Sequence, residues 1–111
     1  MPAYYHIAFT QLPGTIDPQA VEKAIAGMCF DWLRYAGNCY VVWTNSDASM
    51  LAGALMTVSG MRQSNFLVIR VDLAHGDGFA FLPAWAMEWL KKDRTQNPLA
   101  PLYLYGMLPP P

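Results

Sequence analysis

The sequence has few charged residues. Of its 111 residues, 14% are charged and 54% are hydrophobic, whereas roughly 25% charged residues are typical of soluble domains. The net charge is −1, and basic residues are scattered except for Lys91, Lys92 and Arg94. Because nucleic-acid binding depends on clustered Lys and Arg side chains, no strong DNA- or RNA-binding surface is indicated. So little charge on a small domain predicts apolar surface that a partner covers, with an unusually apolar monomer as the alternative.

Cysteine is also scarce, and long apolar runs are lacking. Cys29 and Cys39 are too few for a disulfide scaffold and do not have the spacing of a zinc site. Free thiols are typical of a reducing compartment, so we expect a cytoplasmic protein. We expect no secretory signal and no membrane association, since neither a signal pattern nor a bilayer-spanning run occurs. The glycines form no phosphate-binding or dinucleotide motif, and we predict no metal and no cofactor.

Strand patterns recur along the chain. Alternating aromatic and β-branched residues predict strands at 3–11, 39–44 and 65–73. The short segment 32–35 is expected to pair with 39–44 as a hairpin, across a turn at Gly37 and Asn38.

Helix patterns lie between these strands. Asp17 and Pro18 suit the start of a first helix. Its expected apolar stripe consists of Val21, Ile25, Met28, Cys29 and Trp32. A second helix is predicted at 48–58, capped by Asp47, and a third from Leu82 and Pro83 to Lys91 and Lys92. Trp85 and Trp89 on the third helix are expected as core anchors, with stacking on bases as the alternative.

This order of elements predicts an α+β fold, a ferredoxin-like sandwich with an antiparallel sheet and helices mainly on one face. The other face would carry Tyr4, Ala8, Phe66 and Val68. A solvated sheet face normally alternates apolar and polar residues, and Phe66 and Val68 do not fit such a face. We therefore expect the last helix, a second subunit, or both to cover it.

The C-terminal end of the sequence has an extended, tyrosine-rich pattern. Residues 1–97 are expected to form the domain and 98–111 a separate strand or tail. Because an isolated strand is not stable, PLYLYGM should add to a sheet edge, in its own subunit or exchanged within a homodimer. The predicted interface residues are Tyr4, Phe66, Val68, Leu102, Tyr103, Leu104 and Tyr105.

The chain resembles the small bacterial ferredoxin-fold proteins known as SinR-like. These are distantly similar to the CRISPR-associated adaptation and nuclease subunit and to virulence-associated protein D. The resemblance rests on AYYHIAFT, CYVVWT followed by NSDAS, NFLVIRVDL and WAMEWLKK, over roughly residues 3–92. It implies homodimers, in some relatives with exchanged C-terminal strands. In the nuclease branches the first strand typically ends in an acidic residue, whereas Thr10 and Gln11 stand here, which argues against nuclease activity.

Few residues suggest chemistry. Asp72, His75 and Asp77 gather in the loop DLAHGDG, where a weak metal site and ordinary turn chemistry are the two interpretations. His6 lies among aromatic residues and is expected to be a packed or interface histidine. No catalytic constellation emerges.

Three functions follow as hypotheses. The first is a non-enzymatic homodimer that acts through protein association, as an accessory or regulatory factor. The second is a metal-dependent nuclease of the resembled group with Asp72 and Asp77 as ligands. The third is a small-ligand sensor with a pocket between subunits, lined by Tyr4 and His6.

Overall fold

A computed structural model describes residues 1–10, 16–73, 78, 80–92 and 94. The strands are β1 (Ala3–Phe9), β2 (Cys29–Ala36), β3 (Cys39–Thr44) and β4 (Phe66–Val71), and the helices are α1 (Pro18–Ala26), α2 (Ala48–Leu55), a 3-10 turn η1 (Met61–Gln63) and α3 (Ala84–Lys91). The four strands form one antiparallel sheet in the order β2-β3-β1-β4. The predicted α+β fold with an antiparallel sheet is confirmed.

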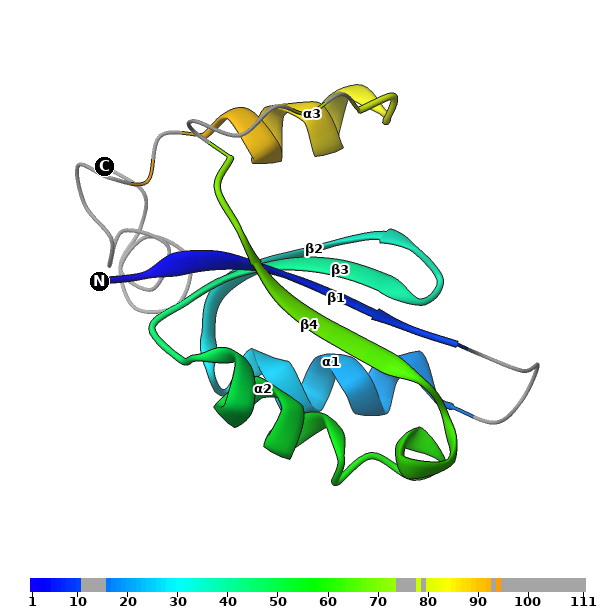
Figure 1. Ribbon diagram of the computed structural model, residues 1–111. Coiled ribbons are helices and arrows are strands. Elements are labelled where there is room, and N and C mark those ends of the chain that lie inside the picture. Colours follow the sequence, from blue (N-terminus) through cyan, green and yellow to red (C-terminus); the bar gives the residue numbers. More distant parts are fainter. Residues whose placement is uncertain (11–15, 74–77, 79, 93, 95–111) are drawn as a thin grey trace.

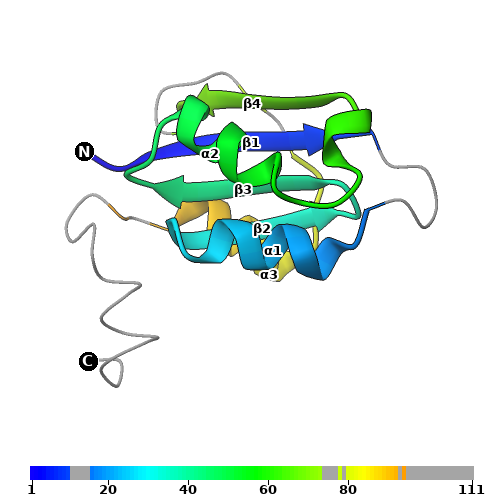
Figure 2. The ribbon, with the colours of Figure 1, turned by 90° about the horizontal axis from the view of Figure 1, so that it is seen from below.

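The helices lie on both faces of the sheet. Figure 1 shows α1 and α2 together on one face and α3 on the other, and in Figure 2 α3 lies behind β2. The core fills the space between the sheet and the α1–α2 layer. Its buried residues include Ile7 on β1, Ile25 on α1 and Leu55 on α2. We call the face under α1 and α2 the core face and the face under α3 the second face.

Both predicted helix caps form. The Asp17 carboxylate accepts a hydrogen bond from the backbone N–H of Gln19 at 3.0 Å. Asp47 accepts one from the N–H of Met50 at 2.8 Å. Each cap satisfies a donor that the first helical turn leaves unpaired, so the sequence sets where α1 and α2 begin.

The end of α1 differs from the prediction. The helix stops at Ala26, and Cys29 and Trp32 lie on β2 instead of on the helical stripe. The predicted 32–35 hairpin partner of β3 does exist, but it extends over Cys29–Ala36. Strand pairing along the whole of β3 therefore overrides the helical spacing, because tertiary contacts routinely outweigh local propensity.

The second helix is also shorter than predicted. It ends at Leu55, and Gly60 follows with φ of 88°, in the left-handed region that favours glycine. This turn leads into η1 and then β4.

The faces of β4 are the reverse of the prediction. In the β1–β4 register, Val68 lies opposite Ile7 and Phe66 opposite Phe9. Phe66 and Val68 therefore pack on the core face, and both are partly buried against the core. Leu67 and Ile69 lie on the second face instead. The alternation within the strand was predicted correctly, but a one-residue difference in register exchanges the two faces.

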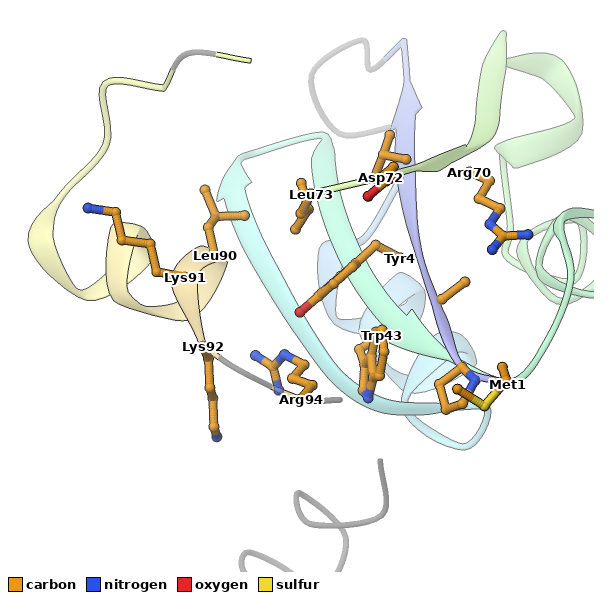
Figure 3. A pocket seen from close by; sticks show the side chains of 13 residues that line it. Met1, Tyr4, Trp43, Arg70, Asp72, Leu73, Leu90, Lys91, Lys92 and Arg94 are labelled. Atoms are coloured by element: carbon orange, nitrogen blue, oxygen red, sulfur yellow. The ribbon is translucent and has the colours of Figure 1, made fainter. Parts of the chain in front are cut away.

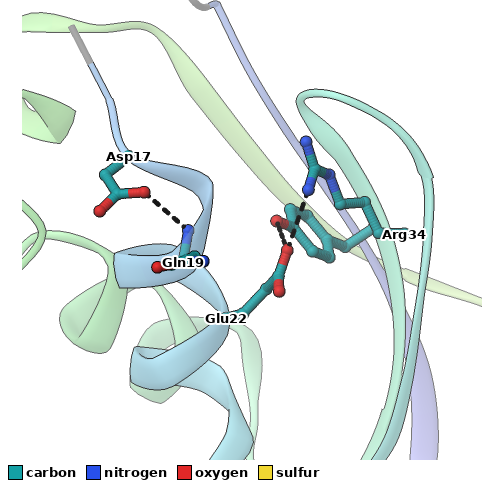
Figure 4. Close-up of polar contacts among 5 residues, drawn as sticks. Asp17, Gln19, Glu22 and Arg34 are labelled. Carbon is teal, nitrogen blue, oxygen red and sulfur yellow. Dashed lines mark hydrogen bonds and ion pairs between the residues drawn. The ribbon is translucent and has the colours of Figure 1, made fainter. Parts of the chain in front are cut away.

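A polar network ties α1 to the sheet on the core side. Figure 4 shows Glu22 on α1, whose Oε2 accepts hydrogen bonds from Arg34 Nη1 at 3.2 Å and from the Tyr40 hydroxyl at 3.0 Å. Burial raises the pKa of Tyr40, and the neighbouring Glu22 carboxylate raises it further. Tyr40 therefore keeps its proton and can donate to Glu22, which satisfies a hydroxyl placed inside the core.

The predicted third helix is confirmed, and it covers part of the second face. Leu33 on β2 and Val41 and Trp43 on β3 are buried on that face. The expectation that the last helix folds over it is therefore correct. Trp85, predicted as a core anchor, is 60% exposed, so on this point the prediction is wrong.

Candidate functional site

An exposed apolar row occupies the part of the second face that α3 leaves open. Leu67 and Ile69 on β4 are 52% and 49% exposed. His6 and Ala8 on β1 lie opposite them in the register, at Ile69 and Leu67 respectively. We call Leu67, Ile69, His6 and Ala8 the open patch. Exposed apolar side chains of this kind are typical of surfaces that associate with another molecule.

The open patch borders an edge of the sheet. In the strand order β2-β3-β1-β4, β4 is an end strand, and among the described residues no strand pairs with its outer side. Its free N–H and C=O groups can accept a further strand. An apolar row beside an unpaired edge is an arrangement suited to strand addition.

His6, the polar member of the open patch, takes part in a small polar cluster that reaches the margin of the patch at Tyr35. Its Nε2 is hydrogen-bonded to the hydroxyl of Tyr35 on β2. Burial lowers the pKa of His6, and burial together with the Cys39 thiol raises the pKa of Tyr35 to about 12. Both side chains are therefore uncharged at neutral pH, and uncharged groups cost less to bury in an assembly than charged ones.

A groove opens at the end of the sheet where β1 begins and β4 ends. Its volume is about 980 Å³, and its lining includes Tyr4, Trp43, Arg70, Asp72, Leu90 and Arg94. Figure 3 shows Tyr4 in the middle of this groove, with Arg70 on one side and Lys91 and Lys92 on the other. We call this cavity the terminal groove.

The aromatic rings of Tyr4 and Trp43 line the terminal groove, and Trp89 adjoins them. The ring of Tyr4 lies 4.6 Å from that of Trp43 and 6.0 Å from that of Trp89 on α3, measured between centroids. The guanidinium of Arg94 lies 4.4 Å from the centroid of Trp89. Its Nη1 donates to Asp31 Oδ2 on β2 at 2.8 Å. Arg94 therefore connects the end of α3 to both the rings and the sheet.

The predicted site residues separate in the structure. Tyr4 lies on the second face, as expected, but it lines the terminal groove, whereas His6 faces Tyr35. Asp72 is exposed and lines the same groove. His75 and Asp77 lie outside the described residues, as do Leu102, Tyr103, Leu104 and Tyr105.

The part of the chain that the structure describes contains no cluster of three metal-ligating side chains. The nuclease assignment and the intersubunit ligand pocket both stay predictions.

Cys29 and Cys39 are free thiols in different surroundings. Burial raises the pKa of Cys29 to about 11, while a hydrogen bond to Thr44 opposes this shift. The Cys39 thiol donates to the Asn38 side-chain oxygen at 3.6 Å. The protonated, half-buried Cys29 is a packing residue, although it lies on β2 and not on the predicted helical stripe.

Several residues of these surfaces were not found from the sequence. The sequence places Leu67 and Ile69 on the predicted strand 65–73, but the alternation with Phe66 and Val68 puts them on the wrong face. Arg94 and Asp31 are 63 positions apart, and no local pattern links them. Sequence spacing carries no signal for such a contact.

No family model matches this chain, and neither a curated protein nor a solved structure shows a significant match. The resemblance to SinR-like proteins therefore stays a prediction. Among the described residues, no helix is long and apolar enough to cross a membrane.

Proposed function

We propose that this chain is a non-enzymatic homodimer that acts through protein association, as an accessory or regulatory factor. The open patch carries the proposal, because Leu67 and Ile69 expose about half of their surface on an end strand. A second copy that covered them would remove apolar area from water, which is the main driving force of protein association.

A ferredoxin-like sandwich is part of the proposal. It is supported by the chain order β1-α1-β2-β3-α2-β4, by the strand order β2-β3-β1-β4 and by the placement of α1 and α2 on one face. A split β-α-β unit repeated twice in one antiparallel sheet has this organisation. We keep the SinR-like resemblance in the proposal on the same grounds.

A second copy of the chain is the partner that fits best. In a two-fold dimer the same surface patch occurs on both subunits, so an apolar row can face its own copy without a separately matched partner. The low charge of the chain, 14%, agrees with a surface that is partly covered. The uncharged state of His6 and Tyr35 at the margin lowers the cost of that contact.

Exchange of the C-terminal tail extends the same proposal. Residues 98–111, with Leu102, Tyr103, Leu104 and Tyr105, would add a strand to the free edge of β4 in the partner subunit. Backbone hydrogen bonds would provide affinity, and alternate side chains would contact the open patch.

The assembly is tested by light scattering coupled to size exclusion. The wild type is expected to be a dimer at micromolar concentration, and Leu67→Glu a monomer, because a carboxylate in the contact would lose its hydration. Met50→Glu on α2 is the matched control, since Met50 is 55% exposed but lies away from the second face. It should remain dimeric.

A monomeric wild type, or equal dissociation of both variants, would contradict the proposal. Removal of residues 98–111 tests the tail separately. A dimer that persists without them would retain the face contact and reject the exchange. Circular dichroism melts of each variant check that the fold is intact.

A further inference from the structure

The terminal groove collects positive charge. Of the seven Lys and Arg residues of the chain, Arg70, Lys91, Lys92 and Arg94 line it. Asp72 is the one carboxylate among the described lining residues, and Asp31 contacts Arg94 from β2. Among the described side chains of the groove, basic residues therefore outnumber acidic ones, although the chain as a whole has a net charge of −1. A concave site of one charge sign concentrates ligands of the opposite sign.

The groove also contains buried donors without acceptors. Among the described residues, three buried side-chain polar atoms have no hydrogen-bond partner: Trp43 Nε1, Trp89 Nε1 and Arg94 Nε. All three are N–H donors. Trp43 and Arg94 line the groove and are 6% and 3% exposed, and Trp89 contacts both Tyr4 and Arg94.

Unpaired buried donors are rare in folded proteins, so two of them on residues that line one cavity, with a third on the adjoining Trp89, need an explanation. A bound group that supplies acceptor oxygens would pair them. Structural packing alone explains why the aromatic rings gather there, but it does not explain why only donors are left over. A positive cavity with unpaired N–H groups matches the chemistry of an oxyanion.

We infer that the terminal groove binds a small organic oxyanion, a carboxylate or a phosphate, whose oxygens accept from Trp43 Nε1 and Arg94 Nε. The apolar part of such a ligand lies against Tyr4 and Leu90, which line the same cavity. A volume of about 980 Å³ is enough for a molecule of metabolite size. The inference does not depend on the dimer, because Leu67 and Ile69 are not among the residues that line the groove.

The test uses the indole N–H signals of the four tryptophans in two-dimensional ¹H–¹⁵N NMR spectra. The probes are phenyl phosphate, benzoate and, as the uncharged analogue, benzyl alcohol. An oxyanion is expected to shift the Trp43 signal, because its N–H group gains an acceptor, and to shift the Trp89 signal through Arg94, whose guanidinium lies over the Trp89 ring. Trp32, which packs near Tyr40, and the exposed Trp85 are internal controls and should not move.

The outcomes separate the alternatives. Shifts with phenyl phosphate alone identify a phosphate site, and shifts with benzoate alone identify a carboxylate site. Equal shifts with benzyl alcohol, equal movement of Trp85, or no movement of Trp43 at millimolar probe would overturn the inference.

A pair of variants sharpens the assignment. Trp43→Phe keeps a ring but removes the N–H, and it should weaken binding about tenfold, the effect of losing one hydrogen bond to a charged group. Trp85→Phe should bind as the wild type does. If Trp43→Phe does not fold, the indole shifts of the wild type still decide whether the terminal groove binds an oxyanion. Leu67→Glu should keep the probe-induced shifts, so that a failed dimer and a failed ligand site are told apart.

Discussion

The ion pair between Arg94 and Asp31 should hold α3 on the second face, and Asp31→Asn tests this. The Arg94 side chain is 1% exposed and that of Asp31 is 23% exposed, with 2.8 Å between Nη1 and Oδ2. The substitution keeps the size of the side chain but removes its charge. It therefore leaves an almost fully buried guanidinium without a counter-charge.

The expected loss can be bounded from the structure. Breaking a buried ion pair by removing one partner costs about 3–5 kcal/mol. Two features of the site reduce this figure. Asp31 is partly open to water, and Arg94 keeps the Trp89 carbonyl at 3.4 Å and the Trp89 ring. We therefore expect Asp31→Asn to lower the free energy of unfolding by about 2–3 kcal/mol, a large part of the 5–15 kcal/mol typical of a domain.

Urea unfolding followed by circular dichroism measures the global loss. Hydrogen exchange of the α3 amides measures local release of the helix, which should rise in the variant. Replacing both partners, with Asp31→Leu and Arg94→Met, should restore stability to within about 1 kcal/mol of the wild type, because no buried charge is then unpaired.

Arg34→Met supplies the control for a more exposed ion pair. Arg34 is paired with Glu22 at 3.2 Å, but its side chain is 36% exposed. Arg34→Met should lower the free energy of unfolding by no more than about 1 kcal/mol. The reasoning is refuted if Asp31→Asn costs as little as Arg34→Met, or if the double variant is as unstable as the single one.

Two further outcomes follow from burial. Leu55→Ala should lower the free energy of unfolding by about 3 kcal/mol, since Leu55 is fully buried. Met56→Ala, at the exposed next position, should lower it by less than about 0.5 kcal/mol. Equal losses for the two variants in urea unfolding would disprove the core assignment. Burial lowers the pKa of His6 from 6.5, so the folded state binds its proton less readily than the unfolded chain. The stability that the neutral His6 contributes is complete above pH 6.5 and is lost as the pH falls through the lower folded pKa. Between about pH 7 and about pH 5, the free energy of unfolding of the wild type should therefore fall by more than that of His6→Gln. A steeper loss in His6→Gln would show that the sign is wrong.

The elements with strong local signals were predictable. Asp17 and Asp47 cap α1 and α2 because the capping carboxylate and the N–H it pairs are only two or three residues apart. The alternation of β4 was equally clear. The end of α1 was not, since Cys29 and Trp32 satisfy both a helical stripe and a strand, and pairing with β3 decides between them.

The candidate surfaces were much less predictable. Apolar residues on both faces of β4 indicated an incompletely covered sheet. Which of them are exposed, Leu67 and Ile69, depended on the register of β4 against β1. The terminal groove brings together β1, β3, β4 and the end of α3. No spacing in the sequence links Trp43 to Arg94, so their unpaired donors could not be anticipated.

By itself, the sequence determined the order of strands and helices, the starts of α1 and α2, and a surplus of apolar surface over charge. These properties depend on neighbours within a few positions and on composition. Only the tertiary structure decided that Leu67 and Ile69 face outward, that Trp43 is buried beside Tyr4, and that Arg94 meets Asp31. Contacts between distant segments are set by sheet register and by which face each helix covers, and both are selected by the packing of the whole chain.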